Sequence, residues 1–117
     1  MIVRLAVSLV LGVCIWVPVL VLAKTKSIES PNNPVIVIKN HQFDPLQLTV
    51  PAGLKIKITV DNQDPTPEEF ESDDLDREQG VEGHAQTMVY IGPLKPGVYK
   101  YWGDFHPDTT KGTIVAQ

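Results

Sequence analysis

The division of the apolar residues into short segments separated by turns does most to limit what this chain can fold into. Each segment is rich in β-branched or aromatic residues, and none carries the 3.6-residue period of a helix. The segments are residues 35–38, 46–50, 56–60, 87–91, 98–102 and 112–116. About six or seven short strands with Pro and Gly turns between them predict an all-β sandwich or barrel. Residues 72–78 could form at most a short turn of helix.

The N-terminal segment, residues 1–23, has the features of a secretory signal peptide. One positive charge, Arg4, precedes a long uncharged apolar run that ends at Ala23. This order of charged, apolar and small residues is typical of a cleaved signal. An uncleaved membrane anchor is the alternative, because about 20 apolar residues can span a bilayer. Pro18 near the end of the run and the small residue Ala23 favour cleavage, so we expect an exported protein.

Cleavage after Ala23 would leave a polar linker, residues 24–34, and one domain, residues 35–117. A domain of this length can bury one modest hydrophobic core. Cys14 is the only cysteine of the chain, and it lies within the predicted signal peptide. The domain is therefore expected to contain no disulfide, no thiolate metal ligand and no cysteine nucleophile.

Acidic side chains are concentrated in one part of the predicted domain, residues 61–82, where Arg77 is the only basic residue. They are Asp61, Asp64, Glu68, Glu69, Glu71, Asp73, Asp74, Asp76, Glu78 and Glu82. A surface of this charge repels nucleic acid and anionic lipid, and it attracts cations or a basic partner. Nucleic-acid binding is therefore excluded. Much of the segment could also be a solvated loop that keeps the protein soluble.

Three stretches of the domain resemble the cupredoxin family. Residues 38–53, with an aromatic-x-Pro corner at residues 43–45 followed by Leu-x-Val-x-x-Gly, are similar to the first hairpin of bacterial cupredoxins. Residues 60–71 are similar to the strand after which cupredoxins place their first ligand histidine, and residues 94–115 to their C-terminal ligand loop. The resemblance extends over nearly all of residues 35–117 and implies a cupredoxin-like Greek-key β-sandwich.

Within that family, residues 66–72 are most similar to the EfeO-type cupredoxin group. Members of this group occur in periplasmic iron-uptake systems beside a membrane iron permease. The resemblance implies a periplasmic protein that handles or oxidises ferrous iron, or transfers electrons, next to that permease. Its implied partners are the permease and other periplasmic iron-uptake components. The implied role is that of a metal-binding or electron-transfer accessory protein rather than a stand-alone enzyme.

The blue-copper site of cupredoxins requires two imidazoles and one thiolate, usually with a weak axial thioether. In the family's C-terminal loop a cysteine stands three residues before the ligand histidine, and here Gly103 stands three residues before His106. Thr109 takes the place of the methionine, and a glutamate takes the place of the first histidine. The resemblance therefore implies that His106 alone is kept, and a type 1 copper centre is excluded.

The remaining candidate metal ligands are His106, Glu69, Glu68 and His41. Imidazole and carboxylate together suit divalent iron, zinc or oxidised copper better than cuprous ion, so the predicted cofactor is a divalent metal ion, iron or copper. Alternation along a strand would place Glu68 on the same face as the core residue Phe70. The similarity to the EfeO-type group favours Glu69 instead, so the sequence leaves the choice between the two glutamates open.

A second hypothesis needs no metal, because no complete set of cupredoxin ligands is present. In it, the sandwich is a protein-interaction module whose acidic face docks on a basic partner. The third histidine of the domain, His84, follows Gly83 in a polar loop and is expected to be exposed. No hydrolase motif supports a catalytic alternative, since Ser72 has no histidine near it and neither a Gly-x-Ser-x-Gly elbow nor a Gly-rich phosphate loop occurs.

Overall fold

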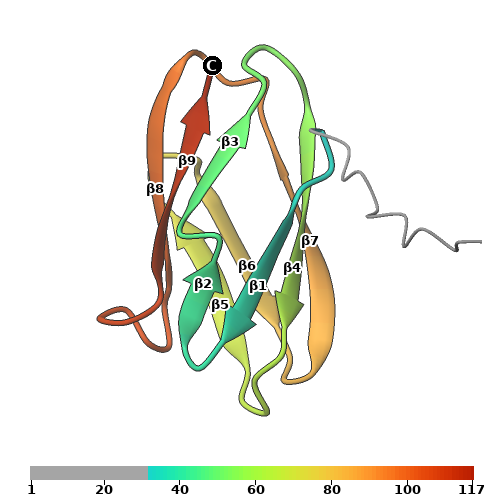
Figure 1. Ribbon diagram of the computed structural model, residues 1–117, viewed down its shortest axis with the longest axis vertical. Helices are drawn as coiled ribbons and strands as arrows, with labels where there is room; N and C mark the ends of the chain where they lie inside the picture. Colours follow the sequence, from blue (N-terminus) through green and yellow to red (C-terminus); the bar gives the residue numbers. More distant parts are fainter. Residues whose placement is uncertain (1–31) are drawn as a thin grey trace, which may run out of the picture.

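The computed structural model describes residues 32–117, which form two β-sheets packed face to face (Figure 1). The predicted signal peptide and most of the predicted linker lie outside the described residues. The strands are β1 (Val35–Lys39), β2 (Gln42–Asp44), β3 (Gln47–Val50), β4 (Ile56–Asn62), β5 (Glu68–Ser72), β6 (Arg77–Val81), β7 (Ala85–Ile91), β8 (Gly97–Gly103) and β9 (Lys111–Ala116). In this part of the chain, no helix is long and apolar enough to cross a membrane.

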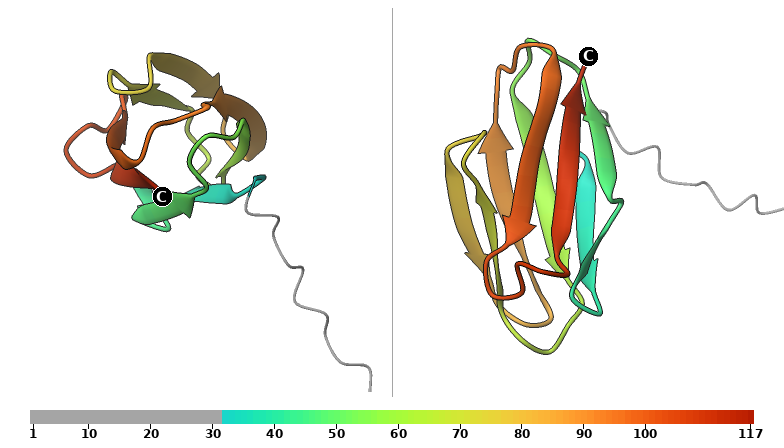
Figure 2. Two further views of the ribbon diagram at one scale, coloured as in Figure 1. Left: turned by 90° about the horizontal axis from the view of Figure 1, so that it is seen from above. Right: turned by 90° about the vertical axis from the view of Figure 1, so that its left-hand side faces the viewer.

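The order of the strands in the two sheets differs from their order in the sequence. One sheet has the order β2-β1-β4-β7, and the other has the order β3-β9-β8-β5-β6. The pairs β1–β4 and β3–β9 are parallel, whereas the other neighbours are antiparallel. The chain therefore crosses repeatedly from one sheet to the other, and Figure 2 shows the two layers from above and from the side. The predicted all-β sandwich is confirmed.

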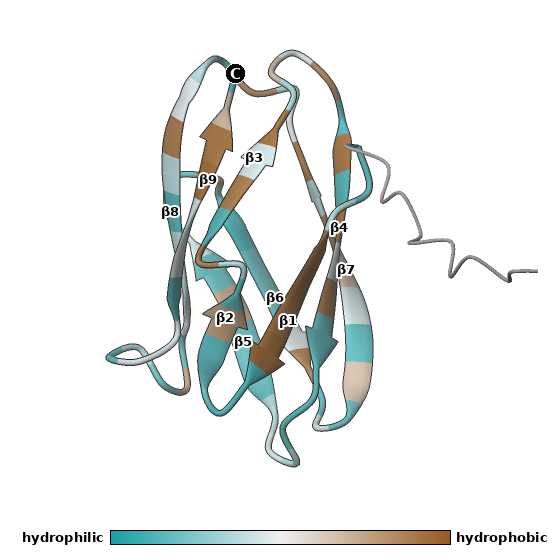
Figure 3. Ribbon diagram, viewed as in Figure 1, coloured by the Kyte–Doolittle hydropathy of each residue, from teal (hydrophilic) through white to brown (hydrophobic). Residues whose placement is uncertain are grey.

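Strand β4 illustrates why these segments form a sandwich. Ile56, Ile58 and Val60 are buried, whereas Lys57 and Thr59 between them are partly exposed. Successive side chains of a strand point to opposite faces, so this alternation turns one apolar face inward. Figure 3 shows the same change from hydrophobic to hydrophilic residues along several strands. The inward faces of both sheets meet in one hydrophobic core.

The edge strand β6 was not predicted from the sequence. Residues 72–78, for which we expected at most a short helical turn, instead end β5, form a turn at residues 73–76 and begin β6. The first four residues of β6 are all exposed, so its sequence lacks the alternation that marks a half-buried strand. The strand forms because β5 offers a partner, with Phe70 opposite Gln79.

An aromatic group from three strands fills the core beneath the candidate site. The ring of Tyr101 stacks on that of Phe70 with 4.9 Å between centroids, and it lies 4.8 Å from that of Phe43. Gly112, opposite Tyr101 on β9, makes room for this ring, because a Cβ atom at Gly112 would lie 2.4 Å from Tyr101 Cζ. Burial raises the pKa of the Tyr101 hydroxyl, which therefore stays protonated.

Replacing Tyr101 by phenylalanine is expected to leave the stability of the domain unchanged or to raise it by about 1 kcal/mol. The Tyr101 hydroxyl is buried and has no hydrogen-bond partner among residues 32–117. Removing it relieves a desolvation cost, whereas the ring keeps its contacts. Urea unfolding of the Tyr101→Phe variant measures the effect. A loss of more than about 1 kcal/mol would mean that the hydroxyl is hydrogen-bonded in solution.

Candidate metal centre

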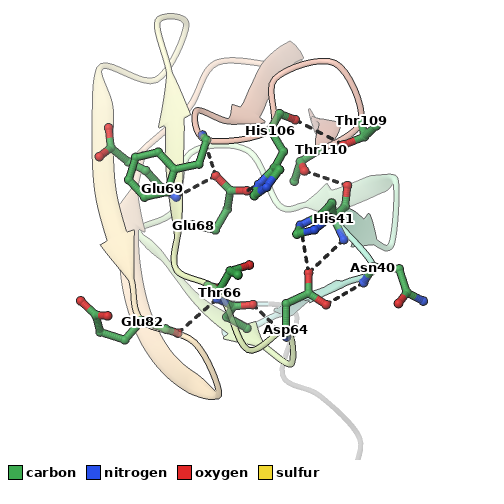
Figure 4. Close-up of polar contacts among 12 residues, drawn as sticks. Asn40, His41, Asp64, Thr66, Glu68, Glu69, Glu82, His106, Thr109 and Thr110 are labelled. Carbon is green, nitrogen blue, oxygen red and sulfur yellow. Dashed lines mark hydrogen bonds and ion pairs between the residues drawn. The ribbon is translucent and has the colours of Figure 1, made fainter.

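Three of the four predicted ligand residues meet at one end of the sandwich (Figure 4). His41 lies in the turn between β1 and β2, Glu68 is the first residue of β5, and His106 lies in the loop between β8 and β9. A ligand atom of each side chain lies within 4.8 Å of ligand atoms of the other two. These segments are far apart in the sequence, so the sandwich topology is what brings the three side chains together.

The turn that carries His41 is held in place from both sides. Asn40 and His41 have positive φ angles of 52° and 55°, as in the two-residue hairpin turns that favour asparagine. Their backbone N–H groups donate to the carboxylate of Asp64 at 2.8 and 2.9 Å. The hydroxyl of Thr110 donates to the carbonyl oxygen of His41 at 2.7 Å. The position of the His41 imidazole is therefore set by two other loops.

Asp64 is a buried anion beside His41. Its Oδ2 atom lies 3.4 Å from Nδ1 of His41, and its backbone N–H donates to the side chain of Asn62 at 3.0 Å. Burial raises the pKa of Asp64, but the N–H groups of His41 and Asn40 and the nearby imidazoles outweigh this effect and hold the pKa below its ordinary value. With Nδ1 of His41 turned toward Asp64, Nε2 is the ring nitrogen left for a ligand.

Glu68 is the most deeply buried charged group of the site, with only 2% of its surface exposed. Its Oε1 atom accepts hydrogen bonds from the backbone N–H groups of Glu69 at 3.0 Å and Phe105 at 2.9 Å. Its Oε2 atom shares a hydrogen bond of 2.6 Å with Nδ1 of His106. A buried carboxylate is tolerated only when it is paired in this way. Alternation along β5 places Glu68 on the inner face together with Phe70.

His106 is partly exposed and stacks on His41. The ring centroids are 3.8 Å apart and the planes differ by 22°. The backbone of His106 closes the loop, because its N–H donates to Gly103 and its carbonyl oxygen accepts from Thr110. The site thus has an exposed side formed by two imidazoles and an inner side formed by the Glu68 carboxylate. His84 is exposed, as predicted, on a loop outside this group.

Asp64 and Asn62 belong to the site but were not predicted from the sequence. Asn62 is buried, and its amide donates to the carbonyl oxygens of Thr66 at 2.8 Å and Glu82 at 3.1 Å. Through its bond with Asp64, Asn62 positions the residue that fixes His41. An Asn-x-Asp pair at the end of an alternating strand is the one sequence signal for this role, since both residue types bond to nearby backbone.

The fourth predicted ligand, Glu69, is not in this group. It lies on the outer face of β5, where an oxygen of Glu69, one of Glu71 and one of Asp104 lie within 4.8 Å of one another. A hydrogen bond with Glu78, burial, and repulsion from Glu78 and Glu71 raise the pKa of Glu69 to about 7. The structure therefore places Glu68 beside the two histidines and Glu69 in a separate acidic cluster.

Replacing Glu69 by glutamine is expected to change how stability depends on pH. The pKa of Glu69 is about 7 in the folded protein and 4.5 ordinarily, so between these pH values the folded state binds more protons than the unfolded state. The contribution of Glu69 to the free energy of unfolding therefore falls as pH rises through that window. The Glu69→Gln variant should exceed the parent in melting temperature at pH 8, and the gap should close near pH 4.5. An equal gap at both pH values, or one also seen in the exposed-site control Glu82→Gln, would contradict this assignment.

A two-sheet sandwich with this strand order, carrying histidines on two loops at one end, defines a cupredoxin-like class of protein. The sequence profile described as "Cupredoxin-like domain" matches residues 12–116. The chain belongs to this family, as its resemblance to cupredoxins implied.

A bacterial protein of similar sequence is also found. The chain is 48% identical over 80 residues to an uncharacterized protein of Rickettsia prowazekii (strain Madrid E), a match that covers 68% of this chain and 64% of that protein. The chain thus spans less than two thirds of the length of this relative.

Among solved structures, auracyanin A, a blue copper protein from Chloroflexus aurantiacus, superimposes with a TM-score of 0.64 at 16% identity over 73% of this chain and 98% of that chain. The metal-binding domain of the Streptococcus pneumoniae Cu(I)-exporting P-type ATPase CopA superimposes with a TM-score of 0.65 at 13% identity. This match covers 73% of the present chain and 84% of that domain's chain. A purple cupredoxin from Nitrosopumilus maritimus superimposes with a TM-score of 0.58 at 23% identity, over 72% of the present chain and 99% of the cupredoxin. These likenesses show the fold.

The side chains of the site do not fit a type 1 copper ion. Residues 32–117 include no cysteine, so no thiolate is present in the described part of the chain. The structure adds a steric reason, because a Cβ atom at Gly103 would lie 2.7 Å from Cδ of Glu68 and 2.8 Å from Cγ2 of Thr110. A cysteine at position 103 is therefore incompatible with the present position of Glu68.

Proposed function

We propose that this protein binds one divalent transition-metal ion through His41, Glu68 and His106. The observation that supports this most is the convergence of two imidazoles on a buried carboxylate, with Nδ1 of His106 2.6 Å from Oε2 of Glu68. The Glu68 and Asp64 carboxylates together bring two negative charges to two imidazoles, which suits a doubly charged cation. The two rings are stacked 3.8 Å apart, so binding of one ion by both would require one imidazole to rotate out of the stack.

The donor set favours borderline and hard ions over cuprous ion. Two imidazole nitrogens and one carboxylate oxygen suit ferrous iron, zinc or oxidised copper, and the three protein ligands leave positions open for water or another molecule. We propose iron as the ion handled in the cell, in a periplasmic accessory protein beside a membrane iron permease. This part of the proposal depends on the predicted signal at residues 1–23 and on the similarity of residues 66–72 to the EfeO-type group.

Metal titration of the purified protein tests the proposal. Ferrous iron under anaerobic conditions, zinc and Cu(II) should each raise the melting temperature, because a ligand bound only by the native state stabilises it by about 2.7 kcal/mol at a hundredfold excess over Kd. Cu(I) should have the smallest effect. If the melting temperature stays the same with every one of these ions, the proposal is overturned.

A metal-free interaction module is the second candidate. The observation in its favour is that both oxygens of Glu68 already have hydrogen-bond partners, so no ion is needed to satisfy this buried carboxylate. The His106 and Glu68 pair would then be a structural ion pair, and the acidic side chains of β5 and β6 would dock on a basic partner. Metal titration separates the two candidates, because this one requires that no metal ion changes the melting temperature.

A further inference from the structure

The outer face of the five-stranded sheet carries charges of opposite sign on its two halves. Alternation along the strands directs Lys100 and Trp102 of β8 and Lys111 of β9 to this face. It directs Glu69 and Glu71 of β5 to the same face. No other element of residues 32–117 covers it, because the sandwich has two layers and their inner faces form the core (Figure 2).

The strand register arranges these side chains in one row across the sheet. Glu78 of β6 is opposite Glu71, Glu71 is opposite Trp102, and Trp102 is opposite Lys111. Side chains directly opposite on neighbouring strands are close neighbours on the same face. The row therefore runs from acidic residues on β6 and β5, through an aromatic residue on β8, to a basic residue on β9.

The basic half also has an apolar hollow of about 410 Å³. Leu46, Trp102 and Gly112 contribute to its lining, and the side chains of Lys100 and Lys111 flank it. Leu46 is 65% exposed and adds apolar surface at the edge of this hollow. An apolar hollow flanked by lysines suits a partner surface that brings carboxylates.

We propose that this face is the contact between two copies of the chain. A two-fold axis parallel to the strands and between β5 and β8 would place Lys111 of one copy over Glu78 of the other, and the reverse contact follows by symmetry. The same operation places the β8 residues Lys100 and Trp102 over the acidic strand β5. An axis across the strands would instead superimpose charges of like sign, so the charge pattern selects one arrangement. Twisted sheets pack face to face in aligned pairs of this kind.

The arrangement also accounts for the concentration of carboxylates on β5 and β6. Glu69, Glu71 and Glu78 lie together within one copy, where a hydrogen bond with Glu78, burial, and repulsion from Glu78 and Glu71 raise the pKa of Glu69. Lysines of a second copy would relieve that repulsion. The proposal does not depend on the metal site, which lies at one end of the sandwich and on its inner side.

Charge exchange tests the proposal by sedimentation equilibrium of the purified protein. The parent should dimerise, and its dissociation constant should rise with salt concentration. Lys111→Glu and Glu78→Lys should each weaken the dimer by about tenfold or more, since each change places like charges together at two symmetric contacts. A mixture of the two variants should form a heterodimer, because every altered contact then pairs opposite charges. Lys39→Glu, on the other sheet, should leave association unchanged.

Two results would overturn this inference. One is a parent protein that stays monomeric up to about 1 mM at low salt, well above the dissociation constants of specific dimers. The other is a dimer whose association is not restored in the mixture of Lys111→Glu and Glu78→Lys, because the contact would then involve a different face.

Discussion

Replacing Glu68 by alanine is expected to lower the free energy of unfolding by about 3 kcal/mol. The change leaves the backbone N–H groups of Glu69 and Phe105 without their acceptor, removes the partner of His106, and opens a cavity where the side chain is 2% exposed. Urea unfolding monitored by the fluorescence of the aromatic residues measures the loss. The experiment is done without added metal, so that the loss reflects the hydrogen bonds and packing of the Glu68 side chain and not the loss of a bound ion.

Two further variants show whether the carboxylate itself is responsible. Glu68→Gln keeps the shape of the side chain and one acceptor oxygen, so its loss should be smaller than that of Glu68→Ala. Glu82→Gln alters an exposed side chain and should change stability by less than about 0.5 kcal/mol. If Glu68→Ala costs no more than Glu82→Gln, the carboxylate is not part of a buried hydrogen-bonded group.

Replacing His106 by alanine is expected to weaken binding of a divalent ion at least about a hundredfold, since even the partners of metal ligands contribute 10- to 100-fold to affinity. His106 supplies the nitrogen nearest to Glu68, at 2.6 Å, and its loss leaves the ion with two protein ligands. Calorimetric titration with zinc, which has no redox chemistry, gives the affinity of the variant and the parent.

The matched control is His84→Ala, which removes an exposed imidazole outside the candidate site and should leave the affinity unchanged. His41→Ala should resemble His106→Ala. Equal affinities for the parent, His41→Ala and His106→Ala would place the bound ion elsewhere on the protein.

Much of the fold could be predicted because burial leaves a pattern in the sequence. Strands such as β4, in which buried and partly exposed residues alternate, can be predicted from the two-residue period of their apolar side chains. Strand β6 shows the limit, since its exposed residues follow no pattern and only its pairing with β5 makes it a strand. An edge strand of this kind is determined by its neighbour.

The candidate site could be predicted only in part, for a related reason. Alternation with Phe70 correctly indicated that Glu68 faces inward, whereas similarity to the EfeO-type group favoured Glu69, which lies on the outer face. The role of Asp64 was not visible, because its hydrogen bonds reach the backbone of Asn40 and His41 in a different hairpin. Contacts with distant backbone leave no periodic signal.

The structure also gives a physical meaning to the missing cysteine. A Cβ atom at Gly103 would lie 2.7 Å from Cδ of Glu68, so the carboxylate of Glu68 fills the space next to this glycine. The departure from the blue-copper pattern is thus one connected change, in which a buried carboxylate occupies space that the side chain at position 103 leaves free. The metal ligands that we propose therefore offer nitrogen and oxygen atoms.

Anomalous diffraction from crystals of the protein loaded with zinc or ferrous iron would locate the bound ion. If the ion binds at the proposed site, one strong peak is expected about 2.0–2.2 Å from a nitrogen of His41, a nitrogen of His106 and an oxygen of Glu68. A peak at the outer cluster of Glu69, Glu71 and Asp104, with none between the two histidines, would contradict the proposal.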